Sequence, residues 1–477
     1  MLNDFLILMK QELIITVIIF VLLFIKIGRK SEKNETVIHL VNVFLFLNVV
    51  ICFFCNSNSG VLFDGFFKTN SLICFEKLIL SIGTLLISML SYNWLKAHKN
   101  VEEFYILLLS TLLGMFLMIS SGHLLMFYLG LELSTIPLAA IANFDLDKRA
   151  SSEAAFKLII SSAFSTALLL LGISFVYGTT GTLSFTELPR LLNPTSSLQI
   201  FAFILLFVGF AFKISVVPFH LWTADVYEGS PVAVTAYLSV ISKGAVLFVF
   251  VSVLYNVFQP LTIVWYNMLM VLSLATIIIG NLFAIRQNNL KRFLAFSSIT
   301  QVGYVLIGIS GDYPANTTSV VYFILIYIFS NLAAFAVISI VSATTNKENI
   351  DDYKAFYKTN PFLSWVITIA LFSLAGVPPT AGFFGKYFLL LAGTHMAASS
   401  GYLFWIVIAA LNLVVSFYYY LKVVKAIFMD ANEQPIQKIK IPFTPKLAML
   451  ICIAGIVLIG LFSVVYNYIY LLSVGAI

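Results

Sequence analysis

The stretch Phe212-Lys213-Ile214-Ser215-Val216-Val217-Pro218-Phe219-His220 decides the class of fold. It continues through a partly charged turn into a second apolar segment that contains Ser242-Lys243. Both lysines therefore lie well inside apolar segments, on either side of a proline interruption. A lysine in the middle of a membrane helix costs about 2.5–3.5 kcal/mol on insertion scales. We expect the chain to use both lysines; the alternative is that each side chain extends to a lipid headgroup.

The composition is that of a membrane protein. Hydrophobic residues make up 61% of the 477 residues and charged residues only 10%, whereas soluble chains are about 45–50% apolar and about 25% charged. Apolar runs of about 20 residues recur along the chain, and each can cross a hydrocarbon core of about 30 Å. Only helices and closed barrels satisfy their backbone hydrogen bonds in lipid, and these runs are too long for barrel strands. The sequence therefore predicts an all-α membrane protein.

The sequence gives no sign of a bound cofactor. It contains no phosphate-binding loop, dinucleotide fingerprint or haem motif, so we expect no redox cofactor and no metal in this chain. The net charge of +6 comes mostly from loop lysines and needs no nucleic-acid partner.

The apolar pattern predicts about fourteen transmembrane helices. They cover residues 11–28, 36–55, 72–95, 102–120, 122–143, 152–178, 197–217, 231–256, 261–285, 290–310, 317–343, 361–397, 402–428 and 446–471. Pro218 interrupts the end of the seventh helix, and Pro378 and Pro379 interrupt the middle of the twelfth. Proline breaks a helix, and neighbouring protein or water must then satisfy the freed backbone groups.

The two broken helices predict an internal repeat. Helices 4–8 and 9–13 form two blocks of five, and each block has a broken fourth member. An odd number of helices inserts the second block upside down, which is the pattern of inverted-repeat transporters with sites at broken helices. We therefore expect an N-terminal three-helix segment (1–100), a first repeat (101–256), a second repeat (257–428) and a C-terminal loop and helix (429–477).

Charges inside the predicted helices mark the candidate site. Glu132 is the only acidic residue near the middle of a span. A buried carboxylate must be paired or protonated, and we expect Lys213 as its partner, with Lys157 second. The alternative is a neutral Glu132 that bonds to Ser134 or a backbone carbonyl. Lys157 can also pair with Glu153 four residues earlier, so that a structural ion pair and a relay role are equally supported.

Lys386 follows the break in the twelfth helix, where carbonyls are freed and water can enter. Polar, uncharged side chains of helices 10 and 11 lie between Lys243 and Lys386 in the expected order: Ser297, Ser298, Thr300, Gln301, Tyr304, Ser330 and Asn331. Buried lysines can exchange protons near neutral pH. One acid followed by spaced lysines therefore predicts a proton relay. By contrast, we expect Glu76-Lys77, at the outer end of the third helix, to be an interfacial pair without function.

Several motifs resemble one protein family. They are Gly130-Leu-Glu132-Leu133, Lys213 to Tyr227, Ser230-Pro-Val232 to Lys243, Asn289 to Tyr304, and Leu374-Ala-Gly-Val-Pro-Pro379 to Lys386. They are long, occur in order and resemble the antiporter-like membrane subunits of respiratory complex I over about residues 100–430. Within that family the chain is most similar to the smallest member, because it ends after helix 14 and has a lysine at 386. Gln301 stands where the family commonly has histidine, so the middle of the relay is expected to rest on water and Tyr304.

The resemblance implies roles for individual residues. Glu132 and Lys213 would form a coupling pair, Lys243 the central relay, and Lys386 the donor on the exit side. Secondary relay positions would be Lys157, His220, Gln301 and Tyr304. It also implies that NADH, FMN, iron–sulfur clusters and quinone are handled by partner subunits.

The expected partners are a second antiporter-like subunit, the small membrane subunits toward the quinone site, and lipids. The expected location is the bacterial inner membrane. The competing hypothesis is a homologous subunit of a cation/proton antiporter or of a membrane-bound hydrogenase. A purely structural scaffold is disfavoured by the cost of three mid-membrane lysines.

Loop charges predict the orientation. Nineteen Lys and Arg residues lie in loops after odd-numbered helices, against three on the other side. By the positive-inside rule, both termini face the periplasm. Tags at residues 1 and 477 should therefore react with an impermeant reagent applied from the periplasmic side. Reaction only from the cytoplasmic side would contradict both the orientation and the helix count.

Overall fold

The computed structural model describes residues 2–28, 34–54, 59–401 and 403–475, without the side chains of residues 2–3 and 395–400. The basic loop at 29–33, which contributes to the predicted orientation, lies outside the described residues. Within the described residues, thirteen helices are long and apolar enough to cross a membrane. The predicted twelfth helix is present as two parts, so the prediction of about fourteen spans is confirmed when these parts are counted together.

The spans have the following bounds: α2 Lys10–Gly28, α3 Asn34–Phe54, α4 Ser71–Leu90, α6 Val101–Ile119, α7 Leu124–Ala142, α8 Arg149–Thr180, α10 Ser197–Ile214, α12 Val232–Tyr237 continuing through the π-helix η2 Leu238–Ser242 into α13 Lys243–Asn256, α14 Thr262–Ile285, α15 Leu290–Ile309, α16 Ala315–Thr345, α18 Pro361–Ala375 with α19 Ala381–Ser400, α20 Leu403–Phe428 and α21 Phe443–Leu461. The shorter elements are α1 Leu2–Leu8, β1 Gly60–Leu62, η1 Phe63–Gly65, β2 Phe67–Thr69, α5 Tyr92–Lys96, α9 Leu188–Leu191, α11 Leu221–Gly229, η3 Gln259–Leu261, η4 Ile350–Tyr353, α17 Phe356–Thr359 and α22 Val464–Val474. Strands β1 and β2 pair antiparallel as a hairpin.

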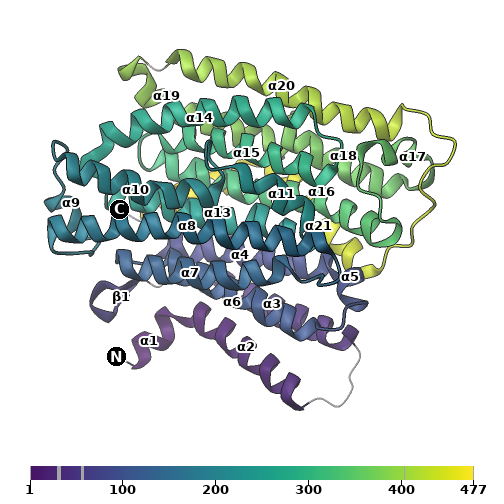
Figure 1. Cartoon of the computed structure of the whole chain (residues 1–477), viewed down its shortest axis with the longest axis horizontal. Helices are drawn as coiled ribbons and strands as arrows, with labels where there is room; N and C mark the ends of the chain where they lie inside the picture. Colours follow the sequence, from purple (N-terminus) through teal and green to yellow (C-terminus); the bar gives the residue numbers. More distant parts are fainter. Residues whose placement is uncertain (1, 29–33, 55–58, 402, 476–477) are drawn as a thin grey trace.

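The helices pack side by side in one bundle (Figure 1). Both termini, the β1–β2 hairpin and α9 lie at one end, here called the terminal end, whereas α5 and α17 lie at the opposite end, here called the basic end. Helices α15 and α16 are buried along most of their length, whereas only about a third or less of α2, α3 and α20 is buried. The candidate residues on α13, α15 and α19 therefore lie against the most buried helices of the bundle.

Both predicted breaks are present. Helix α10 ends at Ile214 because Ser215 adopts a left-handed conformation with φ 67°, and α11 begins only at Leu221. Helix α18 ends at Gly376, whose φ of 88° favours glycine, and α19 begins after Pro378 and Pro379. The prediction of two inverted repeats, and of the domain limits drawn from them, stays a prediction.

Two spans differ from the predicted continuous helices. The predicted helix 446–471 is divided into α21 and α22, because Phe462 has extended backbone angles. Its apolar pattern is uninterrupted there, so hydropathy gives no sign of the division. The predicted helix 231–256 contains the five-residue π-helix η2 directly before Lys243. Such local widening is rare and is frequent at functional sites.

The break in the twelfth span also requires glycine at position 382. A Cβ atom there would lie 1.8 Å from the carbonyl oxygen of Ser373, whereas a Cβ atom at Gly178 of α8 would meet nothing within 4 Å. We expect Gly382→Ala to lower the stability of the detergent-solubilised protein by about 1–3 kcal/mol through overpacking. Gly178→Ala is the matched control and should leave the thermal unfolding temperature unchanged or slightly raised. Equal unfolding temperatures for the two variants would contradict the close approach of α18 and α19.

Candidate functional site

Lys213 lies in the last turn of α10, directly before the first break. Its ammonium group donates to the hydroxyls of Thr135 at 2.5 Å and Ser162 at 2.9 Å. Glu132, one turn before Thr135 on α7, is an electrostatic neighbour of Lys213 but forms no direct ion pair with it among the described residues. The structure therefore brings Glu132 and Lys213 into one polar site, in which two hydroxyls provide the direct contacts.

Lys157 has a different environment. It pairs with Glu153 at 2.8 Å, as the four-residue spacing predicted, and with Asp225 of α11 at 2.7 Å. Asp225 also pairs with Arg292 at 2.7 Å, and Arg292 pairs with Glu228 at 2.8 Å. These side chains are partly exposed, so water stabilises their charges. The network favours the structural role of Lys157 over its alternative as the partner of Glu132.

Lys243 begins α13 and is only 3% exposed. Its Nζ donates to the hydroxyl of Ser298 on α15 at 2.9 Å and lies 5.3 Å from the centre of the Tyr227 ring. The Tyr227 hydroxyl also lies beside Ser298. His220, at the break before α11, is buried and is an electrostatic neighbour of Lys243. The break, the π-helix and α15 therefore converge on one lysine.

Lys386 is likewise 3% exposed and lies in the second turn of α19. Its Nζ donates to the backbone carbonyls of Leu374 at 2.6 Å and Ala375 at 3.2 Å, which the break leaves without helical donors. It also lies 5.5 Å from the centre of the Tyr304 ring. A Cβ atom at Gly376 would lie 3.3 Å from its Cδ atom, so the glycine also makes room for the lysine.

Gln301 lies near the hydrogen-bond partners of both Lys243 and Lys386. It lies on α15, three residues after Ser298, and therefore on the same face of the helix. Its amide nitrogen donates to the Leu374 carbonyl at 3.2 Å and to the Tyr420 hydroxyl at 3.3 Å. The same Leu374 carbonyl accepts from Lys386. Tyr304 instead donates to the carbonyl of Ala409 at 3.2 Å and presents its ring to Lys386.

Several buried polar atoms in this region have no hydrogen-bond partner among the described residues. They are the Tyr227 and Tyr327 hydroxyls, His220 Nδ1, Gln301 Oε1 and Asn331 Oδ1. Buried polar atoms are usually satisfied by protein or by ordered water. Their concentration between α11, α15 and α16 makes this the part of the bundle best suited to hold water.

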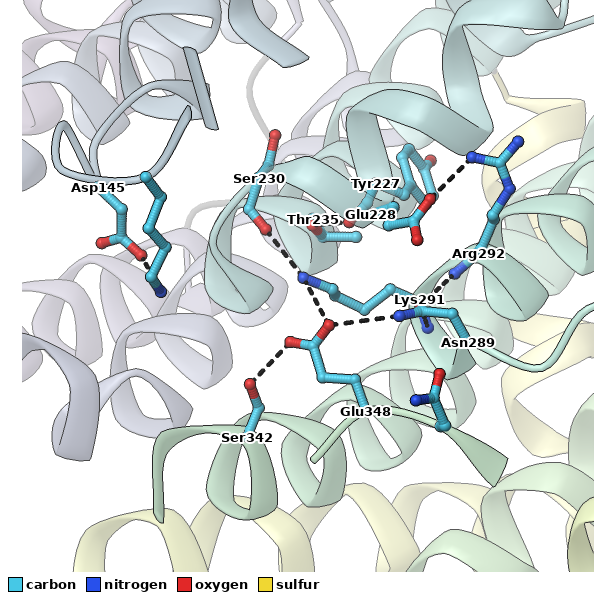
Figure 2. Close-up of polar contacts among 12 residues, drawn as sticks. Asp145, Tyr227, Glu228, Ser230, Thr235, Asn289, Lys291, Arg292, Ser342 and Glu348 are labelled. Atoms are coloured by element: carbon cyan, nitrogen blue, oxygen red, sulfur yellow. Dashed lines mark hydrogen bonds and ion pairs between the residues drawn. The ribbon is translucent and has the colours of Figure 1, made fainter. Parts of the chain in front are cut away.

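A cavity of about 390 Å³ opens at the basic end, between α5, the start of α12, α15 and the end of α16. Lys291 is nearly buried at its side and pairs with Glu348 at 3.1 Å, while Glu348 also accepts from Ser342 at 2.7 Å (Figure 2). Lys291 Nζ reaches the backbone carbonyl of Ser230 at 3.5 Å. Ser230 follows Tyr227 by three residues, so one wall of this cavity lies about one helical turn from the tyrosine that contacts Lys243.

The sequence did not reveal all of these residues. Lys291 and Glu348 lie 57 positions apart in the chain; Lys291 contributes only to the count of loop cations, and no sequence pattern singles out Glu348. The one available signal was the Asn289 cap, whose side chain accepts from the amides of Lys291 and Arg292 and fixes the start of α15. The carboxylates that balance these cations come from other elements, which no local pattern identifies.

One expected pair is wrong. Lys77 does not pair with Glu76; its Nζ lies 2.5 Å from Glu12 of α2, and both side chains are buried. Neighbouring residues on a helix do not face each other, so the adjacency of Glu76 and Lys77 gave no contact. Both members of the Glu12–Lys77 pair are therefore buried within the bundle.

The described residues hold no group of three or more His, Cys, Asp or Glu side chains that could bind a metal ion. The titratable groups of the site are lysines, one glutamate, one histidine and tyrosines. Such groups can carry protons.

Comparison with known proteins places this geometry in a family. The family model described as NADH:quinone oxidoreductase/Mrp antiporter, TM, matches residues 121–413. Subunit N of NADH-quinone oxidoreductase from Phocaeicola vulgatus is 49% identical over 411 residues, which are 85% of this chain and 86% of the relative. The chain belongs to the NADH-quinone oxidoreductase subunit N family.

A second relative and two solved structures are also similar to this chain. Subunit N from Azobacteroides pseudotrichonymphae is 45% identical over 88% of this chain and 87% of its own length. A chain of respiratory complex I from Thermus thermophilus with bound aureothin matches with a TM-score of 0.82 and 28% identity, over 96% of this chain and 98% of that chain. A chain of the Mrp complex from Dietzia has a TM-score of 0.85 at 18% identity, over 100% of this chain and 97% of that chain, which shows the fold alone.

These comparisons confirm the resemblance stated from the motifs. The chain is a multi-pass membrane subunit of the NADH-quinone oxidoreductase type, and its relatives are parts of that enzyme. The motifs quoted above span most of the region that the family model matches. The roles of individual residues in the site are not decided by these similarities.

Proposed function

We propose that this chain translocates protons across the bacterial inner membrane through a buried relay of Glu132, Lys213, Lys243 and Lys386. Electron transfer from NADH to quinone in partner subunits drives the relay. NADH, FMN, the iron–sulfur clusters and quinone are bound by those partners, and the chain contacts a second antiporter-like subunit, the small membrane subunits toward the quinone site, and lipids. Both termini face the periplasm, so that protons enter at the basic end.

The main observation behind this proposal is that Gln301 and Lys386 donate hydrogen bonds to the same backbone carbonyl, that of Leu374. Lys243 bonds to Ser298, Gln301 lies one turn further along the same face of α15, and the Leu374 carbonyl accepts from both Gln301 and Lys386. Each step is a direct hydrogen bond or one turn of a helix. The unpartnered atoms of Tyr227, Tyr327 and Gln301 border this path, so water can complete it.

The three proposed carrier lysines share one kind of contact. Lys213 and Lys243 bond to serine or threonine hydroxyls, and Lys386 bonds to carbonyls. A lysine whose hydrogen-bond acceptors are neutral can lose its proton without leaving an unpaired negative charge. In a buried ion pair, loss of the lysine charge leaves the carboxylate unpaired, which is costly in free energy. These contacts support carrying protons in preference to holding helices together.

The cavity at the basic end is the proposed entrance. It borders Ser230 and Lys291, close to the turn of α11 that presents Tyr227 to Lys243. Glu132 and Lys213 are proposed as the coupling pair, in which a change of charge on one side chain alters the proton affinity of the other. His220 is proposed to pass such changes toward Lys243, because it is electrostatically coupled to that lysine across the first break.

A cation/proton antiporter subunit remains the competing function. The Mrp chain has the same fold but only 18% identity, whereas the subunit N relatives share up to 49%. The higher identity supports the NADH-quinone oxidoreductase assignment. Purification of the native complex distinguishes the two functions. Iron–sulfur subunits that co-purify with the chain support the NADH-quinone oxidoreductase assignment. Their absence, together with sodium/proton exchange activity, contradicts that assignment.

The central relay can be tested with Lys243→Met. Methionine is close in shape and uncharged, so insertion should persist. We expect quinone reduction and proton pumping by membrane vesicles to fall together, because a coupled machine cannot turn over with a blocked relay. Lys358→Met, which removes an exposed lysine of α17, is the matched control. Wild-type pumping by an assembled Lys243→Met variant would reduce Lys243 to a packing residue.

Lys386 requires a test that separates proton release from carbonyl capping. Arginine keeps the charge and can donate to Leu374 and Ala375, but it does not release a proton at accessible pH. We expect Lys386→Arg to pump poorly and Lys386→Glu to pump in part, since glutamate also accepts and releases protons. Pumping assays on the two variants distinguish the roles. A fully active arginine variant beside an inactive glutamate variant would show that Lys386 only caps the break.

A further inference from the structure

A second buried titratable site lies outside the proposed relay, in the N-terminal three helices. Glu12 of α2 and Lys77 of α4 form an ion pair of 2.5 Å between Oε1 and Nζ, with side chains 3% and 1% exposed. The pair lies toward the terminal end, near the start of both helices. The two residues are 65 positions apart in the chain. Their pairing joins α2, of which only 28% is buried, to the core of the bundle.

Aromatic rings surround the ammonium group. The centres of the Phe67 and Phe116 rings lie 5.2 Å and 5.9 Å from Lys77 Nζ. Phe67 belongs to the β1–β2 hairpin at the terminal end, and Phe116 belongs to α6. Glu76, a second carboxyl group, is also buried beside Lys77. The Glu12–Lys77 pair therefore consists of one acid and one base beside two aromatic rings.

Polar atoms beside the pair have no protein partner. Glu12 Oε2 and both amide atoms of the Gln11 side chain are buried without a hydrogen bond among the described residues, and Gln11 is only 2% exposed. A side chain with a donor and an acceptor both unpaired is costly to bury unless water reaches it. Gln11 therefore marks a position next to Glu12, near the start of α2, where buried polar atoms need water.

On the inner side of the pair, one face of α4 is lined with hydroxyls. Ser81, Thr84 and Ser88 follow Lys77 at spacings of four, three and four, and all three are fully buried. Asn48 of α3 donates to the Ser81 hydroxyl at 3.1 Å, and Ser88 contacts Tyr105 of α6 at 2.8 Å. Membrane helices use such residues as interhelical contacts. Here they also extend the polar character of the pair into the bundle.

We propose that Glu12 and Lys77 form a second proton-exchange site, which passes protons between the polar face of α4 and water at the terminal end. The proposal rests on the proton-translocating function given above. A purely structural ion pair would not need the unpartnered side chain of Gln11 or the buried hydroxyls of α4. Replacing both members of a buried pair by uncharged residues is often harmless to stability, so a chain that needed only an anchor has a simpler solution.

The exchange step balances within the pair. One N–H bond of the Lys77 ammonium breaks and an O–H bond forms on Glu12, leaving a neutral amine and a carboxylic acid. As the acid releases its proton to water beside Gln11, the amine takes up a proton from the α4 side, so that neither charge of the pair is left alone in the apolar interior. The site returns to its starting charges, and one proton has moved toward the terminal end.

The test is the double variant Glu12→Gln/Lys77→Met in the assembled complex. It removes both charges together and leaves no unpaired buried ion. We expect normal amounts of the subunit in membranes but a fall of roughly 100-fold in quinone reduction and proton pumping together, the low end for loss of a proton-transfer group. The reciprocal swap Glu12→Lys/Lys77→Glu should recover part of the loss. The matched control Glu35→Gln/Lys96→Met neutralises another 2.5 Å pair of the same segment, which is exposed.

Wild-type pumping by the double variant would overturn the proposal, and so would failure of that variant to assemble, since an anchor alone would then explain the pair. This outcome is distinct from failure of the proposed function. The latter is shown by normal pumping in Lys243→Met, whereas an impaired Lys243→Met beside a normal double variant overturns only the second site.

Discussion

Backbone carbonyls freed inside lipid need donors, and the structure of this bundle depends on how those donors are supplied. At the gap between α18 and α19, Lys386 reaches back to the carbonyls of Leu374 and Ala375. At the gap between α10 and α11, the indole of Trp222 donates to the Phe212 carbonyl at 3.0 Å. In both cases the donor comes from the segment after the gap. These side chains therefore stabilise the breaks, and the candidate site is built around them.

The Leu374 carbonyl belongs both to the break after α18 and to the candidate site. It accepts from Lys386 and from Gln301, so two helices other than its own are joined through one oxygen. In a low-dielectric interior, hydrogen bonds that share an acceptor influence one another. In the proposed relay, a change of charge on Lys386 would alter the hydrogen bond of Gln301, which lies one turn from Ser298, the partner of Lys243. Glutamine can serve in this position without carrying a proton itself, because it holds the acceptor that the lysine uses.

The sequence identified what depends on local pattern. Lysines in apolar runs and the prolines between them marked Lys213, Lys243 and Lys386 and both breaks, because charge and helix breaking are costly in lipid wherever they occur. It failed where a partner comes from a distant helix. Lys77 was assigned to its neighbour Glu76, although Glu12 is its partner, and the pairing of Lys157 with Asp225 across 68 positions had no local signal. The division between α21 and α22 was missed because both sides are equally apolar.

Three environments are found among Lys77, Lys157, Lys213, Lys243 and Lys386, and the environment limits what each lysine can do. Lys157 is partly exposed and pairs with two carboxylates, so water and counter-charges keep it ionised and it serves to join helices. Lys213, Lys243 and Lys386 are held by hydroxyls and carbonyls, which remain in place whether or not the lysine is charged. Lys77 is buried against one carboxylate. Losing a proton to the outside would strand the charge of Glu12, but moving it within the pair leaves the total charge unchanged. A buried ion pair can therefore exchange protons only as a unit, and for that reason both members must be changed together to learn what it does.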